Sequence, residues 1–200
     1  ARAIVRGIIA HAAPGAPFPP DPPTHPVVRG KGGVLHASWR PVAGAAGYRV
    51  FVARDGRGHD DGTRVEATGV DLPGIAPGRV ALVRVTALNA GGESTASEAI
   101  AASADPDGAP ARILVINAFD RLDPWVREDR NRRDQSLEHG LALAGTGHAF
   151  DGAADEAVRD GDAPLGAYAM ADWLLGRESS EHETFSTAAS RSRWSNGLTR

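Results

Sequence analysis

The chain reads VLHASW over residues 34–39, GYRVFV over 47–52 and RVALVRVTALN over 79–89, and closes this region with GGES over 91–94. Apolar residues alternate with polar ones along these runs, and Gly, Pro or Asp residues separate them. Successive side chains of a strand face opposite sides, so this alternation is typical of strands buried on one face. The pattern predicts a half-buried antiparallel β-sandwich. It marks the stretch from Val34 to Glu98 as scaffold, so any chemistry must lie C-terminal to it or outside this chain.

The composition limits the classes of function that the chain can have. It has 200 residues, a net charge of -3 and an isoelectric point near 6.2, which gives no electrostatic footprint for nucleic acid or for an anionic membrane surface. It has no cysteine, which excludes disulfides, thiolate metal sites and cysteine nucleophiles within these residues. No apolar run reaches the ~20 residues that a membrane-spanning helix needs.

The first 26 residues predict a helix followed by a spacer. Residues 1–11 place Ile4, Val5, Ile8 and Ile9 on one helix face, and a helix of this length needs a partner to bury such a face. Two interpretations stay open, namely a frayed amphipathic terminus or the last helix of an upstream domain that is missing here. Residues 12–26 are dense in proline, which fixes φ and removes the backbone donor, so we expect a semi-rigid, extended linker.

Residues 27–103 resemble a fibronectin type III domain. Trp39 and Tyr48 match the two aromatic residues that pack across the core in that family. The family's Ala-x-Asn-x-Gly-Gly-x-Ser motif, which closes the sixth strand, is matched by five residues: Ala87, Asn89, Gly91, Gly92 and Ser94. Ala81 stands where the family usually has a tyrosine whose hydroxyl ties back to the preceding corner. We expect this departure to cost stability without changing the topology.

The polar loop over residues 54–63 contains His59, Asp60 and Asp61, which are residue types that bind metals. Adjacent residues on a glycine-rich loop rarely converge on one ion without a further ligand held elsewhere. We therefore interpret this cluster as a solvent-exposed turn.

After a short linker at 104–111, the pattern changes to alternating strands and helices. Residues 112–119 (RILVINAF) are a continuous apolar run, which is typical of a strand buried on both faces of a parallel sheet. Residues 136–145 then predict a helix, 148–151 a short second strand, 156–161 a turn of helix and 168–175 a third buried strand. This order begins a doubly wound parallel α/β domain. We expect residues 112–200 to be a partial, truncated domain with an unpaired edge and marginal stability of its own.

Residues 112–200 are also similar to a class I glutamine amidotransferase-like region. That region follows fibronectin-like modules in large bacterial cell-wall amidase-type and xanthan-lyase-like proteins. The match rests on the first strand, residues 113–121, and on three later groups: Gly140, Ala142, Leu143, Phe150 and Asp151; Trp173, Leu175, Gly176, Glu178 and Ser179; and Glu183, Thr184, Phe185 and Ser186. Residues 1–8 resemble the terminal helix of zinc-dependent N-acetylmuramoyl-L-alanine amidase domains. A glutamine amidotransferase needs a nucleophilic cysteine, which this chain lacks.

These resemblances imply a non-catalytic accessory region of a secreted, extracellular or envelope-bound bacterial cell-wall hydrolase. The zinc and its ligands would lie in an upstream amidase domain that cleaves peptidoglycan, so we expect no catalytic or metal-binding residue in this chain. The alternative is a fibronectin type III spacer or binding module without a hydrolase parent, which positions an α/β part that binds peptidoglycan or another polysaccharide.

The candidate ligand site lies where the predicted parallel strands end, because open α/β sheets bind ligands at that edge. Asn117, Asp120 and Arg121 follow the first strand, and Glu178 and Ser179 follow the third. An arginine, a hydroxyl and carboxylates that converge there could bind a sugar or a peptide. The structural alternative is that these residues cap helices and pair charges. Ser179 as an esterase nucleophile is a weaker alternative, because the Gly-x-Ser-x-Gly elbow is missing.

Overall fold

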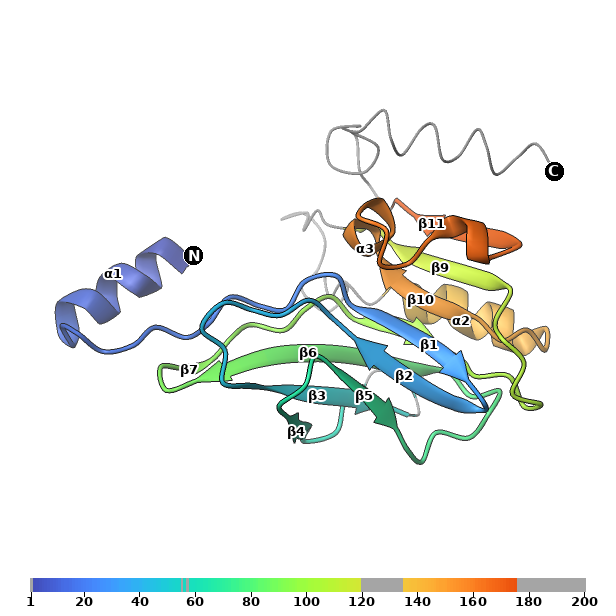
Figure 1. The fold of residues 1–200 in the computed structure, drawn as a ribbon, viewed down its shortest axis with the longest axis horizontal. Coiled ribbons are helices and arrows are strands. Elements are labelled where there is room, and N and C mark those ends of the chain that lie inside the picture. Colours follow the sequence, from blue (N-terminus) through green and yellow to red (C-terminus); the bar gives the residue numbers. More distant parts are fainter. Residues whose placement is uncertain (1, 55, 57, 120–134, 176–200) are drawn as a thin grey trace.

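The computed structural model describes residues 2–54, 56, 58–119 and 135–175. Its first part is a sandwich of two antiparallel layers (Figure 1). One layer contains β1 (Val27–Lys31), β2 (Val34–Ser38) and β5 (Gly69–Leu72). The other contains β4 (Thr63–Val65), β3 (Gly47–Ala53) and β6 (Ala81–Asn89), and β6 also pairs with β7 (Gly92–Glu93) and β8 (Ile100–Ala102). This is the antiparallel sandwich that the alternating pattern predicts.

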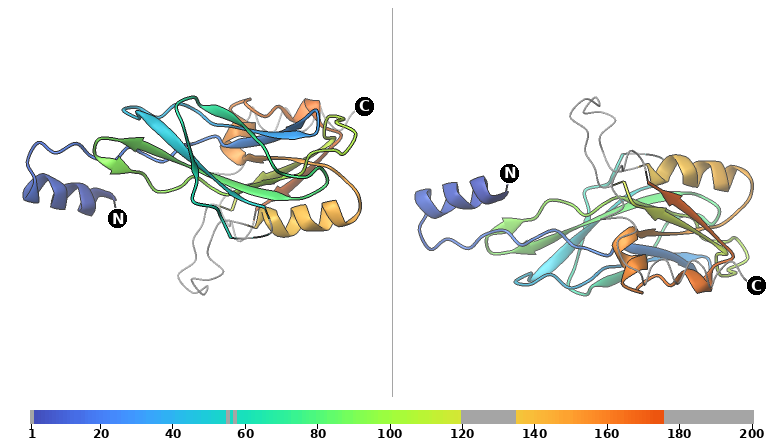
Figure 2. Two further views of the ribbon diagram at one scale, coloured as in Figure 1. Left: turned by 90° about the horizontal axis from the view of Figure 1, so that it is seen from below. Right: turned by 90° about the horizontal axis from the view of Figure 1, so that it is seen from above.

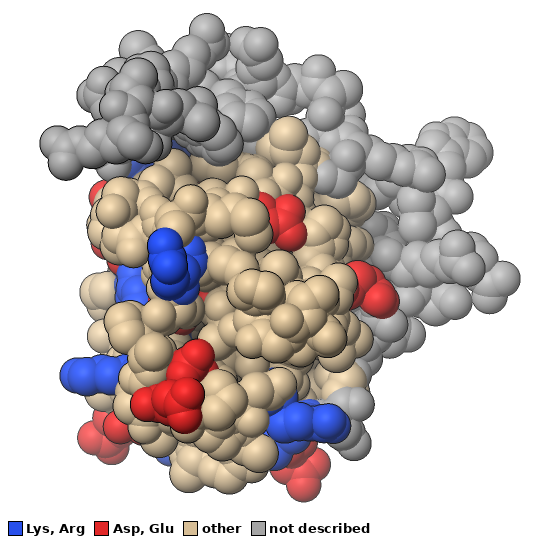
Figure 3. Space-filling view, turned by 90° about the vertical axis from the view of Figure 1, so that its right-hand side faces the viewer, with Lys and Arg blue, Asp and Glu red and all other residues tan. Residues whose placement is uncertain are grey.

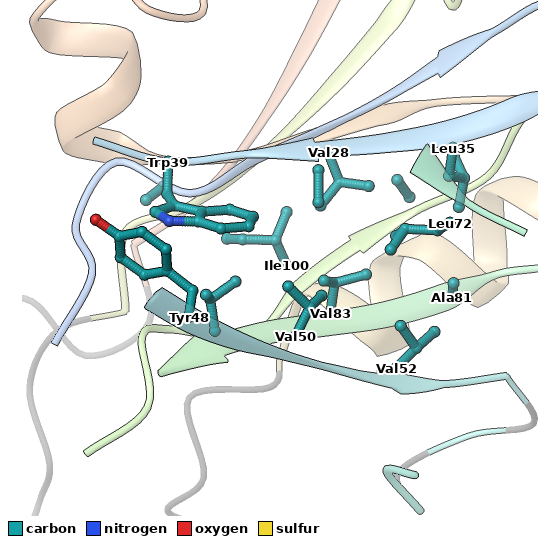
Figure 4. Packing of buried hydrophobic residues seen from close by; sticks show 14 of the residues in the cluster. Val28, Leu35, Trp39, Tyr48, Val50, Val52, Leu72, Ala81, Val83 and Ile100 are labelled. Atoms are coloured by element: carbon teal, nitrogen blue, oxygen red, sulfur yellow. The ribbon is translucent and has the colours of Figure 1, made fainter. Parts of the chain in front are cut away.

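The core of the sandwich lies between the two layers (Figure 4). The rings of Trp39 and Tyr48 meet edge to face, with centroids 5.3 Å apart and planes at 65°, a geometry that adds ~1 kcal/mol to the burial of the two rings. The Tyr48 hydroxyl accepts the backbone N–H of Val42 at 3.0 Å, so its one polar atom is satisfied. Ala81 is fully buried in this core at the start of β6.

The second part adds three parallel strands with the first of them in the middle. They are β9 (Ile113–Asn117), β10 (Asp151–Ala154) and β11 (Met170–Leu174). The helix α2 (Ser136–Gly145) lies over the face that carries Ile113 and Val115, whereas α3 (Asp155–Arg159), before the short η2 turn (Leu165–Ala167), lies over the face of Leu114 and Ile116. All five residues of β9 are buried, which confirms the prediction of a strand covered on both faces.

Two of the predicted strands differ from the observed ones. The second begins at Asp151 and not at His148, because the segment that pairs with β9 is the Ala-rich run up to Ala154. The third is only partly buried, with Met170 exposed and Leu174 buried. It was predicted to be a buried strand, but among the described residues it lies at the edge of the sheet.

The parallel strands are not separate from the sandwich. β10 pairs with β9 on one side and, antiparallel, with β1 on the other, where Val27 lies opposite Ala153 and Val28 opposite Gly152. The result is one six-stranded sheet in the order β11-β9-β10-β1-β2-β5. The segment 104–111, predicted as a linker, therefore joins two parts that share this six-stranded sheet. Of the two edges of the three parallel strands, the β10 edge is paired with β1, and β11 forms the other edge among the described residues.

A second joint links β8 to the α/β part. The Ser136 hydroxyl donates to the carbonyl of Ala99 at 3.0 Å and accepts the N–H of Ala101 at 3.2 Å, so it bonds two backbone groups of this region. Ser103 and Phe150 exchange two backbone hydrogen bonds of 2.9 and 3.1 Å. The sandwich thus covers a face of the α/β part that was expected to be bare.

The two parts also share a hydrophobic core. It contains Leu82 and Ala101 of the sandwich together with Val115, Leu137 and Phe150 of the α/β part. The contact is close, since a Cβ atom at Gly152 would lie only 2.1 Å from the carbonyl oxygen of Ala101. A stable partner for the three parallel strands is therefore built into the chain.

The helix α1 (Arg2–Ala12) projects from the end of the molecule opposite to the parallel strands (Figures 1 and 2). Ile4 and Ile8 are 69% and 61% exposed, which fits the predicted apolar face without a partner among the described residues. None of the described helices is long and apolar enough to cross a membrane.

Candidate functional site at the carboxyl edge of the parallel strands

The carboxyl ends of β9 and β11 lie side by side. Their register ends with Asn117 opposite Leu174, and the N–H of Ala118 donates to the carbonyl of Leu174 at 3.0 Å. The next strand in the sequence, β10, pairs with one side of β9, and β11 pairs with the other side. A sheet whose connections diverge in this way opens a crevice beyond the strand ends, where ligands bind in α/β proteins. The described strands therefore form the kind of sheet edge that the predicted site requires.

Asn117 is the predicted site residue that the structure describes. It is fully buried, and its side-chain oxygen accepts the N–H of Phe119 at 3.4 Å. This bond shapes the turn at Ala118 and Phe119 by which the chain leaves β9. The other predicted site residues, Asp120, Arg121, Glu178 and Ser179, lie outside the described residues and stay predictions.

A second group of polar side chains borders the same edge beside β10, and the sequence did not indicate it. His25 Nε2 lies 2.9 Å from Asp160 Oδ2, and Arg40 bonds both Asp160 at 3.1 Å and Asp162 at 2.7 Å. The two residues of each of these bonded pairs are 120 to 135 positions apart in the chain, so no local pattern could group them. The hydrogen bond from His25 holds the pKa of Asp160 below its usual value.

This group, which we call the junction cluster (His25, Arg40, Asp160 and Asp162), fastens the segment before β1 to the residues after α3. A hollow of about 260 Å³ lies beside it and is lined in part by His25, Trp39, Arg40 and Asp162. His25 has a φ of 57°, a left-handed conformation that costs a non-glycine residue ~1 kcal/mol. The polar atoms of the cluster bond to one another, so we interpret it as a structural latch.

A buried carboxyl group lies at the opposite, amino-terminal end of β10. Asp151 accepts the N–H of Gly30 and the hydroxyl of Tyr168, both at 2.8 Å. Burial raises the pKa of Asp151 and, together with the neighbouring Asp151 carboxyl, raises the pKa of Tyr168 to about 12. These residues join β1 to the α/β part and do not reach the carboxyl edge.

Among the described residues, no three His, Cys, Asp or Glu side chains are placed to hold a metal ion. Asp60 accepts the backbone N–H groups of Val52 and Gly62 and pairs with Arg54, which fits the interpretation of its loop as a turn. His139 bonds Asp172 at 2.7 Å. On the face shown in Figure 3, acidic and basic side chains are interspersed.

No protein-family model and no curated protein matches the chain, but solved fibronectin type III domains are similar to part of it. The fn3 domain of the human collagen alpha-1(XX) chain is 28% identical over 48% of this chain and 96% of that one, with a TM-score of 0.39. A structure named FN3tt is 19% identical over 42% of this chain and 96% of that one, with a TM-score of 0.37. The chicken CNTN1 FN1-FN3 domains are 21% identical over 45% of this chain and 33% of that one, with a TM-score of 0.38.

The sandwich has the strand order and the Trp39–Tyr48 contact that the resemblance to fibronectin type III domains implies. The predicted similarities to a glutamine amidotransferase-like region and to amidases have no counterpart among these neighbours, and they stay predictions.

Proposed function

We propose that this chain is a non-catalytic accessory region that spaces and orients the functional parts of a larger secreted protein. The observation that carries the proposal is the shared six-stranded sheet, in which a fibronectin type III sandwich continues into three parallel strands. The sandwich and the parallel strands of such a unit keep a fixed distance and orientation relative to each other, because strand pairing and a common core leave no hinge between them.

We further propose that the larger protein is a bacterial cell-wall hydrolase of the N-acetylmuramoyl-L-alanine amidase type. In support, the sequence of residues 1–8 resembles the terminal helix of such domains, and α1 presents Ile4 and Ile8 without a partner among the described residues. The zinc-activated water that cleaves the muramoyl-peptide amide would belong to the upstream domain.

Zymography against peptidoglycan tests the absence of catalysis in this chain. The purified protein is expected to give no lytic band, with a known lytic enzyme as the positive control. A band that survives further purification would contradict the proposal. Hydrolysis of a nitrophenyl ester that disappears in Ser179→Ala would instead support the esterase alternative.

A second candidate function is polysaccharide binding at the carboxyl edge of β9 and β11. The strand order of this sheet favours it, since β9 and β11 end side by side at Asn117 and Leu174 and their connections diverge. Asp120 and Arg121 follow β9 in the sequence, and Glu178 and Ser179 follow β11. Pull-down with insoluble peptidoglycan, and in parallel with a xanthan-type polysaccharide, separates the two functions. A pure spacer stays in the supernatant with both materials. Retention that is lost in Arg121→Ala but kept in Arg112→Ala would establish the binding function.

A further inference from the structure

The proline-rich segment runs along the sandwich and is held at both ends. Residues 17–26, which we call the strap, end where the N–H of Arg40 donates to the carbonyl of Thr24 at 3.1 Å and the N–H of Ala154 donates to that of Pro26 at 3.0 Å. Pro23 and Pro26 are buried. Proline residues have no N–H to donate, so a segment rich in them must bind to a partner through its carbonyl groups and its rings.

The hairpin between β6 and β7 supplies such a partner at the other end of the strap. The Asn89 side-chain NH₂ donates to the carbonyl of Phe18 at 2.9 Å, while its oxygen accepts the N–H of Gly91 at 2.7 Å. The bond to Gly91 thereby fixes the orientation of the Asn89 amide within the hairpin. Its NH₂ group then donates to the strap. This residue belongs to the Asn-x-Gly-Gly motif that the sequence assigned only to closing the sixth strand.

The fit between the hairpin and the strap depends on the absence of a side chain at Gly91. A Cβ atom there would lie 2.4 Å from the carbonyl carbon of Phe18 and 2.4 Å from the carbonyl oxygen of Pro17. Both atoms belong to the strap backbone and cannot rotate away. Gly91 thus permits the strap to lie directly on the hairpin.

The helix α1 is in turn attached to the strap. The Arg6 guanidinium lies over the Phe18 ring, 5.9 Å from its centroid, and pairs with Asp21 at 3.3 Å. A cation over an aromatic face and an exposed ion pair each contribute modestly, but together they link the helix to a segment that is itself docked.

We propose that the β6–β7 hairpin is a docking site for the strap, and that docking converts the proline-rich segment from a linker into a rigid arm that holds α1 in a fixed direction. The Asn89 donor recognises the carbonyl of Phe18, and Gly91 provides the room. The inference goes beyond the proposed spacer role, because it holds whatever the α1 face binds.

Distance measurement between two spin labels tests this arm in the complete chain. The chain has no cysteine, so Ala10→Cys on α1 and Glu66→Cys on the sandwich, both at exposed positions, can be labelled specifically. The native strap is expected to give one narrow distance distribution. Asn89→Asp keeps the acceptor for Gly91 but removes the donor to Phe18, and Gly91→Ala inserts the clashing Cβ atom. Each variant is expected to broaden the distribution, because the strap is then no longer held against the hairpin.

Gly166→Ala is the matched control, since a Cβ atom at Gly166 meets nothing within 4 Å, and it should leave the distribution narrow. A broad distribution in the native strap would overturn the proposal. So would a distribution that stays narrow and unshifted in both Asn89→Asp and Gly91→Ala. Should Gly91→Ala fail to fold, Asn89→Asp alone decides, because its change is confined to one atom of an existing side chain.

Discussion

Replacement of Gly152 by alanine tests the joint between the sandwich and the parallel strands. The added Cβ atom would lie 2.1 Å from the carbonyl oxygen of Ala101 and 2.6 Å from Cγ2 of Ile100. An ordinary carbon–oxygen contact is about 3.3 Å, so β10 and β8 must separate by about 1 Å. The obstructing oxygen belongs to the backbone, and no side-chain rotation relieves the contact.

The expected free-energy change follows from two opposing contributions. Overpacking of this kind costs up to ~3 kcal/mol, whereas replacing glycine by alanine restricts the unfolded chain and returns ~0.7 kcal/mol. The net loss in the free energy of unfolding is therefore ~2 kcal/mol. With a urea m-value of ~2 kcal/mol per molar, the midpoint of unfolding should fall by ~1 M.

Urea unfolding followed by tryptophan fluorescence measures this loss. Gly166→Ala is the control in the same part of the chain, because its Cβ atom has open space, and its midpoint should stay within ~0.3 M of the native value. If Gly152→Ala unfolds at the same urea concentration as Gly166→Ala, then β10 does not lie against β8 and the reasoning is refuted.

Two further substitutions test other parts of the joint. Ser136→Ala leaves the N–H of Ala101 and the carbonyl of Ala99 without the hydroxyl that bonds them. The free energy of unfolding in urea should therefore fall by ~2 kcal/mol. A fall below ~0.5 kcal/mol would show that the hydroxyl is dispensable. Burial raises the pKa of Asp151, so the protonated carboxyl is favoured in the folded state, and stability from this group is lost as the pH rises from its unfolded pKa through its folded pKa. Asp151→Asn cannot ionise and should gain stability relative to the native chain as the pH rises above the unfolded pKa of an aspartate, about 4. A difference in midpoint that stays constant as the pH rises would contradict the assignment.

The sequence predicts the elements whose signals are local. Residues 136–145 have helical spacing and are the helix α2, and the apolar run that contains Ile113–Asn117 is a buried strand. The sandwich is equally readable, because each strand shows its own alternation between turn residues. Trp39 and Tyr48 meet in the core as the resemblance to fibronectin type III domains implies.

The joint between the two parts could not be predicted from local signals. β10 reads Asp-Gly-Ala-Ala, which has no β-branched or aromatic residue, and its pairing with β1 connects residues more than 120 positions apart. Pairing of this kind is decided by the fit of tertiary surfaces and by the absence of a side chain at Gly152. The same holds for the junction cluster, in which His25 and Asp160 are 135 positions apart in the sequence.

The central claim is that the sandwich and the parallel strands form one cooperative unit, and calorimetric unfolding of the complete chain tests it most directly. One transition is predicted, with a calorimetric enthalpy about equal to the van't Hoff enthalpy, and Gly152→Ala should shift that whole transition to lower temperature. Two transitions, of which only the lower one responds to Gly152→Ala, would show that the two parts fold independently and would contradict the account.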